Sequence, residues 1–386
     1  MRRTRAIVNE CCRGRSNAVW PSKRQHSETS NVGTGCQLWL RNRLGVLWSP
    51  VTMSYLHGFE EGGGERFLTL AVRNDGDVRM ICPGLSETQA RREGIRDVRA
   101  WRDGEDPLAH FRELVEDWGL GSAMVAVDDE LPAQMLLRMQ TAAPQAHFRT
   151  GSEILSKLMR IKEPQELAHM RKAAQIADEA LAAGLAAIRP GITELEVEDA
   201  LNAEMRRLGG RPAFCIVASG PNGAEPHHLS DETVVREGDV VVLDFGCTVH
   251  GYYSDITRMA VVGKAPSEAE KVHEIVLRAH QAARNAIRPG VTAESIDRAA
   301  RQIIEEAGYG DKFMHRLGHG IGLRGHEEPN MVAGNSHLLE PGNCFSVEPG
   351  IYLPGKFGVR IENIVTVTGD GHESLNEEPP DELTLV

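Results

Sequence analysis

The chain has 386 residues, of which 41% are hydrophobic and 25% are charged. This length favours two or three domains, and this composition excludes a disordered, collagen-like or coiled-coil chain. The lack of any apolar run of about 18 residues excludes a transmembrane helix, and the net charge of −12 argues against nucleic acid as the main partner, because phosphate binding needs clustered Lys and Arg.

Residues 1–40 differ from the rest of the chain. They carry seven Lys or Arg against two acids, hold three of the seven cysteines, and show neither helical nor strand periodicity. A secretory signal is not expected, because no apolar core of about 7–15 residues follows the arginines. We expect an atypical basic, disordered extension. An organellar transit peptide and a region translated from a misplaced start codon are the alternatives.

The cysteines favour a reducing compartment. Their number is odd, they are scattered along the chain, and no CxxC pair occurs. A disulfide framework or a cysteine-bound zinc site is therefore not expected, and the cytoplasm is the expected location.

Residues 41–150 have the pattern of a small α/β domain. The apolar runs at residues 67–72 and 123–127 predict strands. Residues 107–118 have the spacing of an amphipathic helix, with apolar side chains on one face. This alternation of strands and helices precedes a region of different character.

Residues 151–386 contain an internal repeat. The sequence Ala-Ile-Arg-Pro-Gly-Ile-Thr of residues 187–193 returns at residues 286–292 with a single change, Ile to Val. Each copy follows an Ala-rich helix and precedes a second helical pattern, at residues 195–208 and 296–307. An apolar strand that ends in an acid then follows in each copy. We therefore expect two α+β halves related by a pseudo-twofold axis.

Each half is predicted to contain a hairpin with two acids. Folding the first hairpin about residues 249–250 sets Asp244 opposite Asp255, and the second hairpin sets Glu348 opposite Glu362. Opposed side chains have Cβ atoms about 4.5–5.5 Å apart, where carboxylates repel unless a cation lies between them. Four such acids indicate an oxygen-rich site for two divalent metal ions. The alternative, that the acids are solvated strand ends, fits Asp244 poorly because apolar residues precede it.

Histidines on glycine-rich segments are further candidates for this site. His319 stands between two glycines, which allow close backbone approach, and lies between the two hairpins in sequence. We therefore interpret it as a ligand, although a lone histidine is more often structural. His326 and the pair His227-His228 are further candidates for the cavity. We expect the other histidines on helices and at the hairpin tip to be structural or solvent-exposed: His273, His280 and His250.

Several segments together resemble the signature of the pita-bread metallopeptidases. The chain is most similar to the proline-specific branch, Xaa-Pro dipeptidase (prolidase) and Xaa-Pro aminopeptidase. The spacings of 11, 64, 29 and 14 residues between its five ligand positions match the prolidase pattern. The segments that carry the resemblance are Leu243-Asp244-Phe245-Gly246, Ser254-Asp255-Ile256-Thr257-Arg258, Gly318-His319-Gly320-Ile321-Gly322-Leu323, Ser346-Val347-Glu348-Pro349-Gly350 and Val359-Arg360-Ile361-Glu362-Asn363.

The resemblance also implies a fold. It runs from about Gly45 to Val386, and Tyr55-Leu56-His57-Gly58-Phe59 is similar to a motif of the family's N-terminal domain. The implied fold class is α/β plus α+β. A creatinase-like N-terminal domain over residues 41–150 would precede a pseudo-twofold pita-bread catalytic domain over residues 151–386.

The resemblance further implies a dinuclear metal centre. Asp255 and Glu362 would bridge both ions, Asp244 would chelate one of them, and His319 and Glu348 would hold the other. Hard oxygen ligands with one imidazole suit Mn²⁺, while Co²⁺ or Zn²⁺ would also fit.

Four residues would take part in catalysis by the same resemblance. Glu348 would accept and shuttle a proton, and His326 would stabilise the oxygen of the tetrahedral intermediate. His227 would contact the scissile nitrogen side, and Arg360 would orient Glu362.

The implied reaction is hydrolysis of the bond between an N-terminal residue and proline in short proline-containing peptides. An Xaa-Pro aminopeptidase that acts on longer peptides is the alternative. Some dipeptidases carry an Arg shortly after the His-Glu motif that binds the free carboxylate of proline. Asn330 stands in that place here, and Arg324 is a candidate substitute, so the substrate length stays open.

Other readings of the resemblance fit less well. Methionine aminopeptidase shares the fold and ligands but typically lacks the N-terminal domain. Creatinase-type amidinohydrolases share both domains but not the five metal ligands. A non-catalytic pita-bread module that binds proteins has usually lost ligands, whereas all five are present here. Because relatives commonly dimerise, we expect a homodimer.

Overall fold

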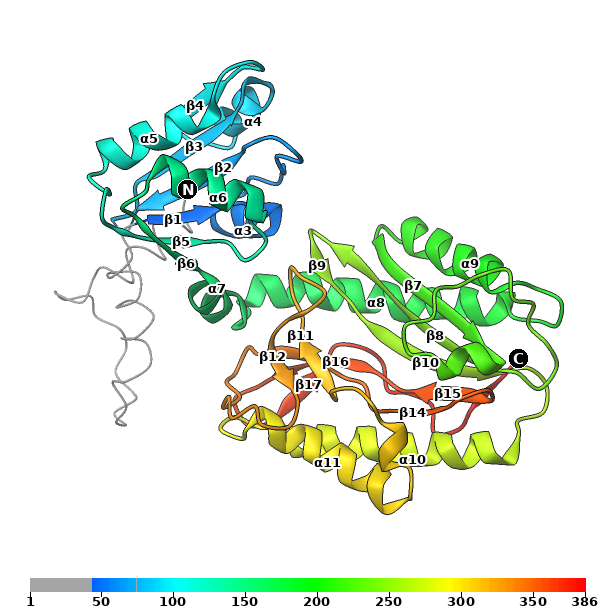
Figure 1. Ribbon diagram of the computed structural model, residues 1–386. Coiled ribbons are helices and arrows are strands. Elements are labelled where there is room, and N and C mark those ends of the chain that lie inside the picture. The colour runs from blue at the N-terminus through cyan, green and yellow to red at the C-terminus, as the bar shows by residue number, and fades with distance from the viewer. Residues whose placement is uncertain (1–43, 74) are drawn as a thin grey trace. The chain divides into compact units, whose positions relative to one another are not determined.

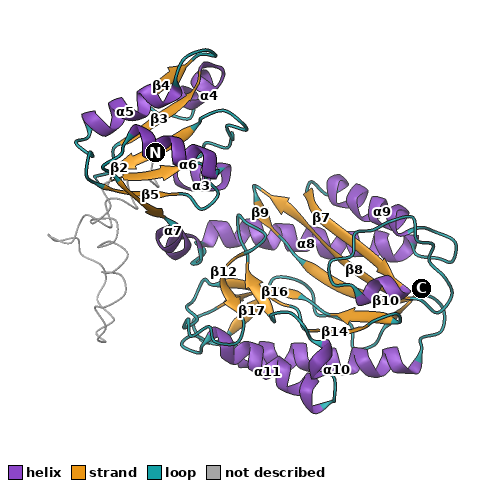
Figure 2. Cartoon of the chain, viewed as in Figure 1, coloured by secondary structure: helices purple, strands orange, loops and turns teal. Residues whose placement is uncertain are grey.

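The computed structural model of the protein describes residues 44–386 except Asn74, so the extension expected over residues 1–40 lies outside the described residues. The chain divides into two compact units, Met1–Leu158 and Met159–Val386. Figure 1 and Figure 2 show the helices and strands of each unit.

The first unit is built on one mixed sheet with the strand order β4-β3-β2-β1-β5-β6. Its central strands β1, β2 and β3 are antiparallel neighbours, whereas β3–β4, β1–β5 and β5–β6 are parallel pairs. The strands predicted at residues 67–72 and 123–127 are β2 and β5, and the predicted helix is α5. The elements are β1 (Leu44–Leu47), α3 (Pro50–His57), β2 (Thr69–Arg73), β3 (Val78–Pro83), α4 (Glu87–Arg92), β4 (Asp97–Trp101), α5 (Pro107–Asp117), β5 (Met124–Val127), α6 (Ala133–Ala142) and β6 (His147–Thr150).

Helix α5 illustrates how the local sequence determines where a helix of the first unit begins and which of its faces is buried. The Asp106 side chain precedes the helix and accepts a hydrogen bond from the backbone N–H of Leu108 at 3.1 Å. Pro107 occupies the first turn, where its missing N–H costs nothing. Phe111 and Leu114 are three positions apart and fully buried in the core of this unit. The N-cap at Asp106 and the buried apolar face therefore both stabilise α5.

The second unit carries helices on both sides of its strands. Helices α8 and α9 lie on one side, and α10 and α11 lie on the other (Figure 1). The strands form the path β18-β10-β8-β7 with β9 paired to β8, the sheet β12-β11-β13-β16-β17, and the pair β14-β15. The elements are α7 (Ser152–Met159), which begins before the boundary between the units, α8 (Pro164–Ala187), α9 (Glu194–Arg207), β7 (Arg211–Ser219), β8 (Val240–Val249), β9 (Tyr252–Tyr253), β10 (Ile256–Val261), α10 (Ser267–Ala286), α11 (Ala293–Glu306), β11 (Gly318–Gly320), β12 (Glu327–Met331), β13 (Cys344–Val347), β14 (Gly350–Leu353), β15 (Phe357–Arg360), β16 (Asn363–Val367), β17 (His372–Ser374) and β18 (Thr384–Leu385).

The internal repeat forms two equivalent corners. Gly191 and Gly290 have positive φ angles of 92° and 83°, a conformation that side-chain-bearing residues rarely adopt. The N–H groups of these glycines donate to the carbonyl oxygens of Val235 and Leu339 at 2.9 and 2.8 Å, respectively. The N-cap of the next helix, α9 or α11, follows two residues later in each copy. The predicted pair of related halves is therefore confirmed.

Candidate metal centre

The two acids of the first hairpin share a face but are not directly opposite each other. Asp244 on β8 pairs with Thr257 on β10, so the predicted pairing with Asp255 was wrong. The turn consists of His250 and Gly251, with φ angles of 49° and 81°, and lies one residue later than predicted. This moves the register by two residues. Because side chains alternate with a period of two, Asp255 stays on the face of Asp244 as its diagonal neighbour.

The second hairpin has the predicted register. The pairing of β13 with β16 ends at Val347 and Asn363, and β14 pairs with β15 in the same register. Glu348 and Glu362 lie in the gap between these two ladders and are set opposite each other. Each strand of this hairpin is therefore interrupted at its acid.

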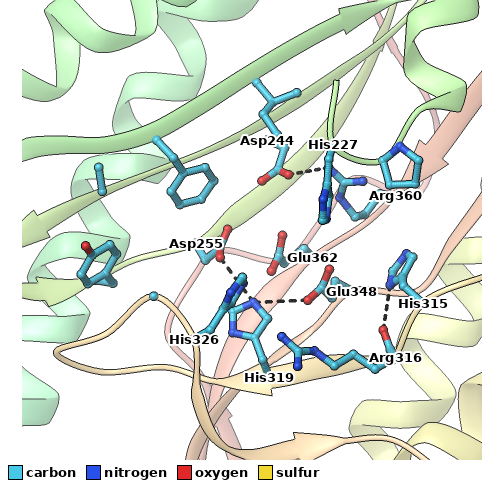
Figure 3. Close-up of a pocket in the computed structure, with 16 residues that line it drawn as sticks. His227, Asp244, Asp255, His315, Arg316, His319, His326, Glu348, Arg360 and Glu362 are labelled. Carbon is cyan, nitrogen blue, oxygen red and sulfur yellow. Dashed lines mark hydrogen bonds and ion pairs between the residues drawn. The ribbon is translucent and has the colours of Figure 1, made fainter. Parts of the chain in front are cut away.

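Strand β11 carries His319 to the same centre. The ring Nδ1–H donates to the carbonyl oxygen of Gly320 at 3.0 Å, which leaves the lone pair on Nε2. The Nε2 atom lies 3.8 Å from Oδ2 of Asp255 and 3.4 Å from Oε1 of Glu348 (Figure 3). Burial, followed by the neighbouring His326, lowers the pKa of His319 to about 3. The ring is thus held as the neutral tautomer that binds metals.

The acids leave buried oxygen atoms without hydrogen-bond partners. Within the described residues, these atoms include Oδ1 of Asp244, Oδ1 of Asp255 and Oε1 of Glu362. A buried polar atom without a partner is costly, and a charged one more so. One ligand atom each from Asp255, His319 and Glu362 lies within 4.8 Å of the others. This donor set fits divalent cations that prefer oxygen with one imidazole.

Burial, together with repulsion between neighbouring acids, raises the pKa values of Asp255, Glu348 and Glu362. Burial is the largest cause for Asp255, followed by the charge of Glu362, and its pKa is well above the ordinary value. The pKa of Glu362 is raised in the same way, by burial and then by Glu348. Burial raises the pKa of Glu348 to about 7. Cations would remove this repulsion, because they stabilise the ionised form of each acid.

Arg360 is a buried cation beside the acids. Its Nη2 atom forms an ion pair with Asp244, and its Nη1 atom donates to the Tyr352 hydroxyl at 2.8 Å. Its Nε atom donates to Oγ1 of Thr257 at 3.2 Å, and that hydroxyl donates to Oε2 of Glu362 at 2.7 Å. The expected link between Arg360 and Glu362 therefore runs through Thr257, while the direct pair is with Asp244.

A cavity of about 500 Å³ lies over the acids. His227 and His326, the histidines assigned to catalysis by resemblance, line it from different sides (Figure 3). The His326 ring meets the His319 ring edge-on, with centroids 4.0 Å apart. Phe214 and Ile216 add apolar surface to the wall. The cavity thus combines polar groups with space for a small apolar side chain.

The second histidine of the His227-His228 pair has a different place. His228 is not part of the cavity wall; its Nε2 atom bonds to Oε2 of the fully buried Glu194 at 2.7 Å. The other oxygen of Glu194 accepts from the backbone N–H of Ser219 at 2.7 Å and from the Asn222 amide at 3.0 Å. Glu194 thus ties the loop that carries His227 to the start of α9. Sequence reasoning missed Glu194, which showed no signal beyond an acid in a first helical turn.

Glu194, His228 and Asp231 could also hold a metal ion by residue type and proximity. The oxygens of Glu194 are, however, already occupied by N–H and O–H donors. Glu194 and His228 therefore belong to a hydrogen-bonded network with the loop.

Sequence reasoning also missed His315, Arg316 and Tyr352. His315 and Arg316 line the cavity, and the His315 Nδ1–H donates to the Arg316 carbonyl oxygen at 2.7 Å. The buried Tyr352 hydroxyl donates to Nε2 of His315 at 2.9 Å. The available signal was distance along the chain: each lies within four residues of His319 or Glu348.

Comparisons with known proteins agree on one family. The model of metallopeptidase family M24 matches residues 168–369. The probable dipeptidase PepE of Mycobacterium tuberculosis is 41% identical over 350 residues, which cover 88% of this chain and 91% of the relative. The Xaa-Pro dipeptidase of Lactobacillus helveticus is 35% identical and covers 89% and 96%. The crystal structure of a prolidase from Thermococcus sibiricus superimposes with a TM-score of 0.86 at 33% identity and covers 93% and 100%.

Proposed function

The chain belongs to metallopeptidase family M24, and from this membership we propose that it hydrolyses the bond between an N-terminal residue and proline in dipeptides. The similarity to an Xaa-Pro dipeptidase and to a prolidase over most of each chain supports this substrate class. The observation that carries the proposal within this molecule is the set of orphaned carboxylate oxygens around His319.

The residues proposed to hold two divalent ions are those of the two hairpins and β11. Asp255 and Glu362 would hold both ions, Asp244 would hold one, and His319 and Glu348 would hold the other. The Nε2 atom of His319, which lies 3.8 Å from Asp255 and 3.4 Å from Glu348, and the unpaired carboxylate oxygens support this assignment. The donor set suits Mn²⁺, and Co²⁺ or Zn²⁺ would also fit.

The ions, when bound, lower the pKa of water enough to supply hydroxide near neutral pH. The chain then has to move a proton and to stabilise negative charge. Glu348 would accept the proton, and the Ser346 hydroxyl, which donates to its Oε1 atom at 2.9 Å, fixes its orientation. His326 would donate to the oxygen that becomes negative, and His227 would bind on the side of the leaving nitrogen.

Hydrolysis of an equimolar mixture of Ala-Pro and Ala-Pro-Ala tests the reaction. The Mn²⁺-loaded full chain is incubated with the mixture, with Ala-Ala as the proline-free control, and the products are separated by chromatography. Preferential loss of Ala-Pro is expected. Preferential loss of the tripeptide would instead identify an Xaa-Pro aminopeptidase, and loss of neither would contradict the proposal. Fewer than one bound ion per chain after metal loading would favour a non-catalytic binding module.

We propose a cytoplasmic location and a homodimer as well. The described cysteines Cys82, Cys215, Cys247 and Cys344 are all free, which suits a reducing compartment. Of the helices in the described part of the chain, none has the length and hydrophobicity needed to cross a bilayer. The expectation of a dimer comes from the family. Cell fractionation checks the location, and a monomer peak in sedimentation analysis would contradict the dimer.

A further inference from the structure

The two arginines that line the cavity are paired very differently. Arg360 is buried and bonded to Asp244, Tyr352 and Thr257. The side chain of Arg316 is half-buried and makes neither a hydrogen bond nor an ion pair with any of residues 44–73 or 75–386. A guanidinium carries five N–H donors and is always charged. The cavity therefore contains a guanidinium that has neither a hydrogen-bond nor an ion-pair partner within the described part of the chain.

The backbone that carries Arg316 is held in place, although its side chain is unpaired. Arg301 on α11 donates to the carbonyl oxygens of Phe313 and His315 at 3.0 and 2.9 Å. Asp297, also on α11, accepts from the backbone N–H of Leu317 at 3.1 Å. The segment on both sides of Arg316 is thus anchored to a helix. A charged group on a fixed backbone loses less freedom when it binds a ligand.

The Arg316 guanidinium extends into the cavity toward His319, beside Glu348 (Figure 3). Its positive charge contributes to lowering the pKa values of His319 and His326, after the larger effect of burial. The same charge lowers the pKa of Glu348, against the larger effect of burial, which raises it. Burial is the larger cause for each of these groups, so what these effects indicate is that the Arg316 guanidinium lies close to the proposed site.

Resting on the proposed function, we propose that Arg316 binds the C-terminal carboxylate of the substrate and so selects dipeptides over longer peptides. In a dipeptide this carboxylate carbon is three bonds from the scissile carbonyl carbon, a distance of about 3–4 Å. In a tripeptide it is six bonds away, about 7 Å. A cation beside the proposed metal-binding residues can therefore reach the carboxylate of a dipeptide. The planar guanidinium can also donate to both carboxylate oxygens at once.

The two positions considered from the sequence fit this role less well. The Asn330 amide donates to Oε1 of Glu328 at 2.9 Å, and Asn330 is not part of the cavity wall. Arg324 does not line the cavity either. Arg316 thus supplies the basic group that position 330 lacks, from a position before His319 in sequence and not after His326.

The test compares Ala-Pro with Ala-Pro-amide, which differ only in the charge of the C-terminus. The ratio of kcat/KM for these substrates is measured for the Mn²⁺-loaded full chain and for Arg316→Gln and Arg316→Lys. In the unmodified chain Ala-Pro is the better substrate. Arg316→Gln is expected to lower kcat/KM for Ala-Pro about 10- to 100-fold, mainly through KM, because a charge-assisted hydrogen bond is lost. It should change kcat/KM for the amide less than about threefold, and Arg316→Lys should restore part of the preference.

Binding provides a readout independent of turnover. Titration calorimetry with proline and prolinamide should show weaker binding of proline to Arg316→Gln and little change for prolinamide. Arg298→Gln, which alters an exposed arginine outside the cavity, is the matched control. The unchanged reaction of the amide shows that the variant is folded.

Three outcomes would overturn the assignment of Arg316. The unmodified chain could fail to prefer Ala-Pro over its amide, Arg316→Gln could weaken both substrates equally, or Arg324→Gln could abolish the preference instead. In each case Ala-Pro is still hydrolysed by the unmodified chain, so the proposed function survives. Failure to hydrolyse either substrate would contradict the proposed function itself.

Discussion

The two acid-bearing hairpins of the second unit differ in how well local pattern fixes their register. The second hairpin has the register that the sequence predicts. The first is displaced by two residues, because its turn consists of His250 and Gly251 with positive φ. A two-residue turn with both residues in that region matches the twist of antiparallel strands. Turn chemistry therefore set the register, and strand alternation alone kept Asp244 and Asp255 on one face.

The halves also differ at the corner where the repeat leads into α9 or α11. The position after the N-cap is Glu194 in the first half and Ala293 in the second, and both side chains are fully buried. Only the first half has the His227 loop to hold in place, and Glu194 accepts hydrogen bonds from that loop. The two halves thus share a backbone arrangement at this corner, but only the first uses it to hold a loop of the cavity wall.

The largest effect is expected from removing one acid of each hairpin. Asp255→Ala and Glu362→Ala should each lower kcat by more than about 1,000-fold, since even partners of metal ligands cost about 10- to 100-fold. If the hairpins are equivalent, both variants should also lose bound metal to a similar degree, as measured by elemental analysis. Glu270→Ala, an exposed acid on α10, is the control. Near-normal turnover and metal content in Asp255→Ala would contradict the assignment.

The second effect concerns the asymmetry between Glu194 and Ala293. Glu194→Gln keeps the side-chain shape but weakens the bond to His228, so the His227 loop should become less ordered. We expect kcat/KM for Ala-Pro to fall about 3- to 10-fold, in line with a loss of about 1 kcal/mol per hydrogen bond. Metal content should stay unchanged, because the hydrogen bonds to Glu194 come from Ser219, Asn222, His228 and Asp231, which are outside the proposed metal-binding set. Loss of metal would show that the network has a wider structural role.

The third effect is a pH dependence of stability in the metal-free protein. The pKa of Asp255 is raised by burial and then by the neighbouring acids. Such a group stabilises the fold fully below its unfolded pKa of about 4, and this contribution is lost as pH rises through the folded pKa. The side chain of the Asp255→Asn variant is uncharged at every pH. In the presence of a chelator, the Tm of this variant should therefore exceed that of the unmodified chain at pH 8 and match it only below about pH 4.

Thermal unfolding of both proteins across this pH range makes the comparison. The buried histidines His273 and His280 also have lowered pKa values through burial, but they are common to both proteins and cancel in the difference. Parallel Tm curves for the two proteins would show that the repulsion among the acids is not expressed in solution. With metal bound, the difference should reverse, because Asp255 would then hold cations.

The smallest effect tests the turn that set the first register. His250 has a φ of 49°, which a side-chain-bearing residue adopts at a cost, and Asn tolerates this region better. His250→Asn should raise the free energy of unfolding by about 0.5 kcal/mol and leave kcat/KM unchanged. Denaturant unfolding of the metal-loaded protein measures the change. A clear loss of stability would mean that the contact between the His250 and His169 rings stabilises the fold by more than the positive φ of His250 costs.

Much of the molecule could be predicted from sequence where the signal is local or repeated. The strands, helices and pseudo-twofold repeat follow from periodicity, caps and two copies of one heptapeptide, and the family assignment follows from motif spacing. His273 and His280, which were predicted to be structural, are buried, and His250 is exposed at the hairpin tip, as predicted. These features depend on neighbours in the chain, which the sequence lists directly.

Tertiary structure decided which groups meet and which remain unpaired. It separated His227, which lines the cavity, from His228, which bonds to Glu194. It joined Arg360 to Asp244 and left Arg316 without a partner among the described residues. The physical reason is that a charge or hydrogen-bonding group is satisfied by atoms from distant segments. Residue type and spacing determined the chemistry available to this protein, and the packing of those segments determined where each group can act.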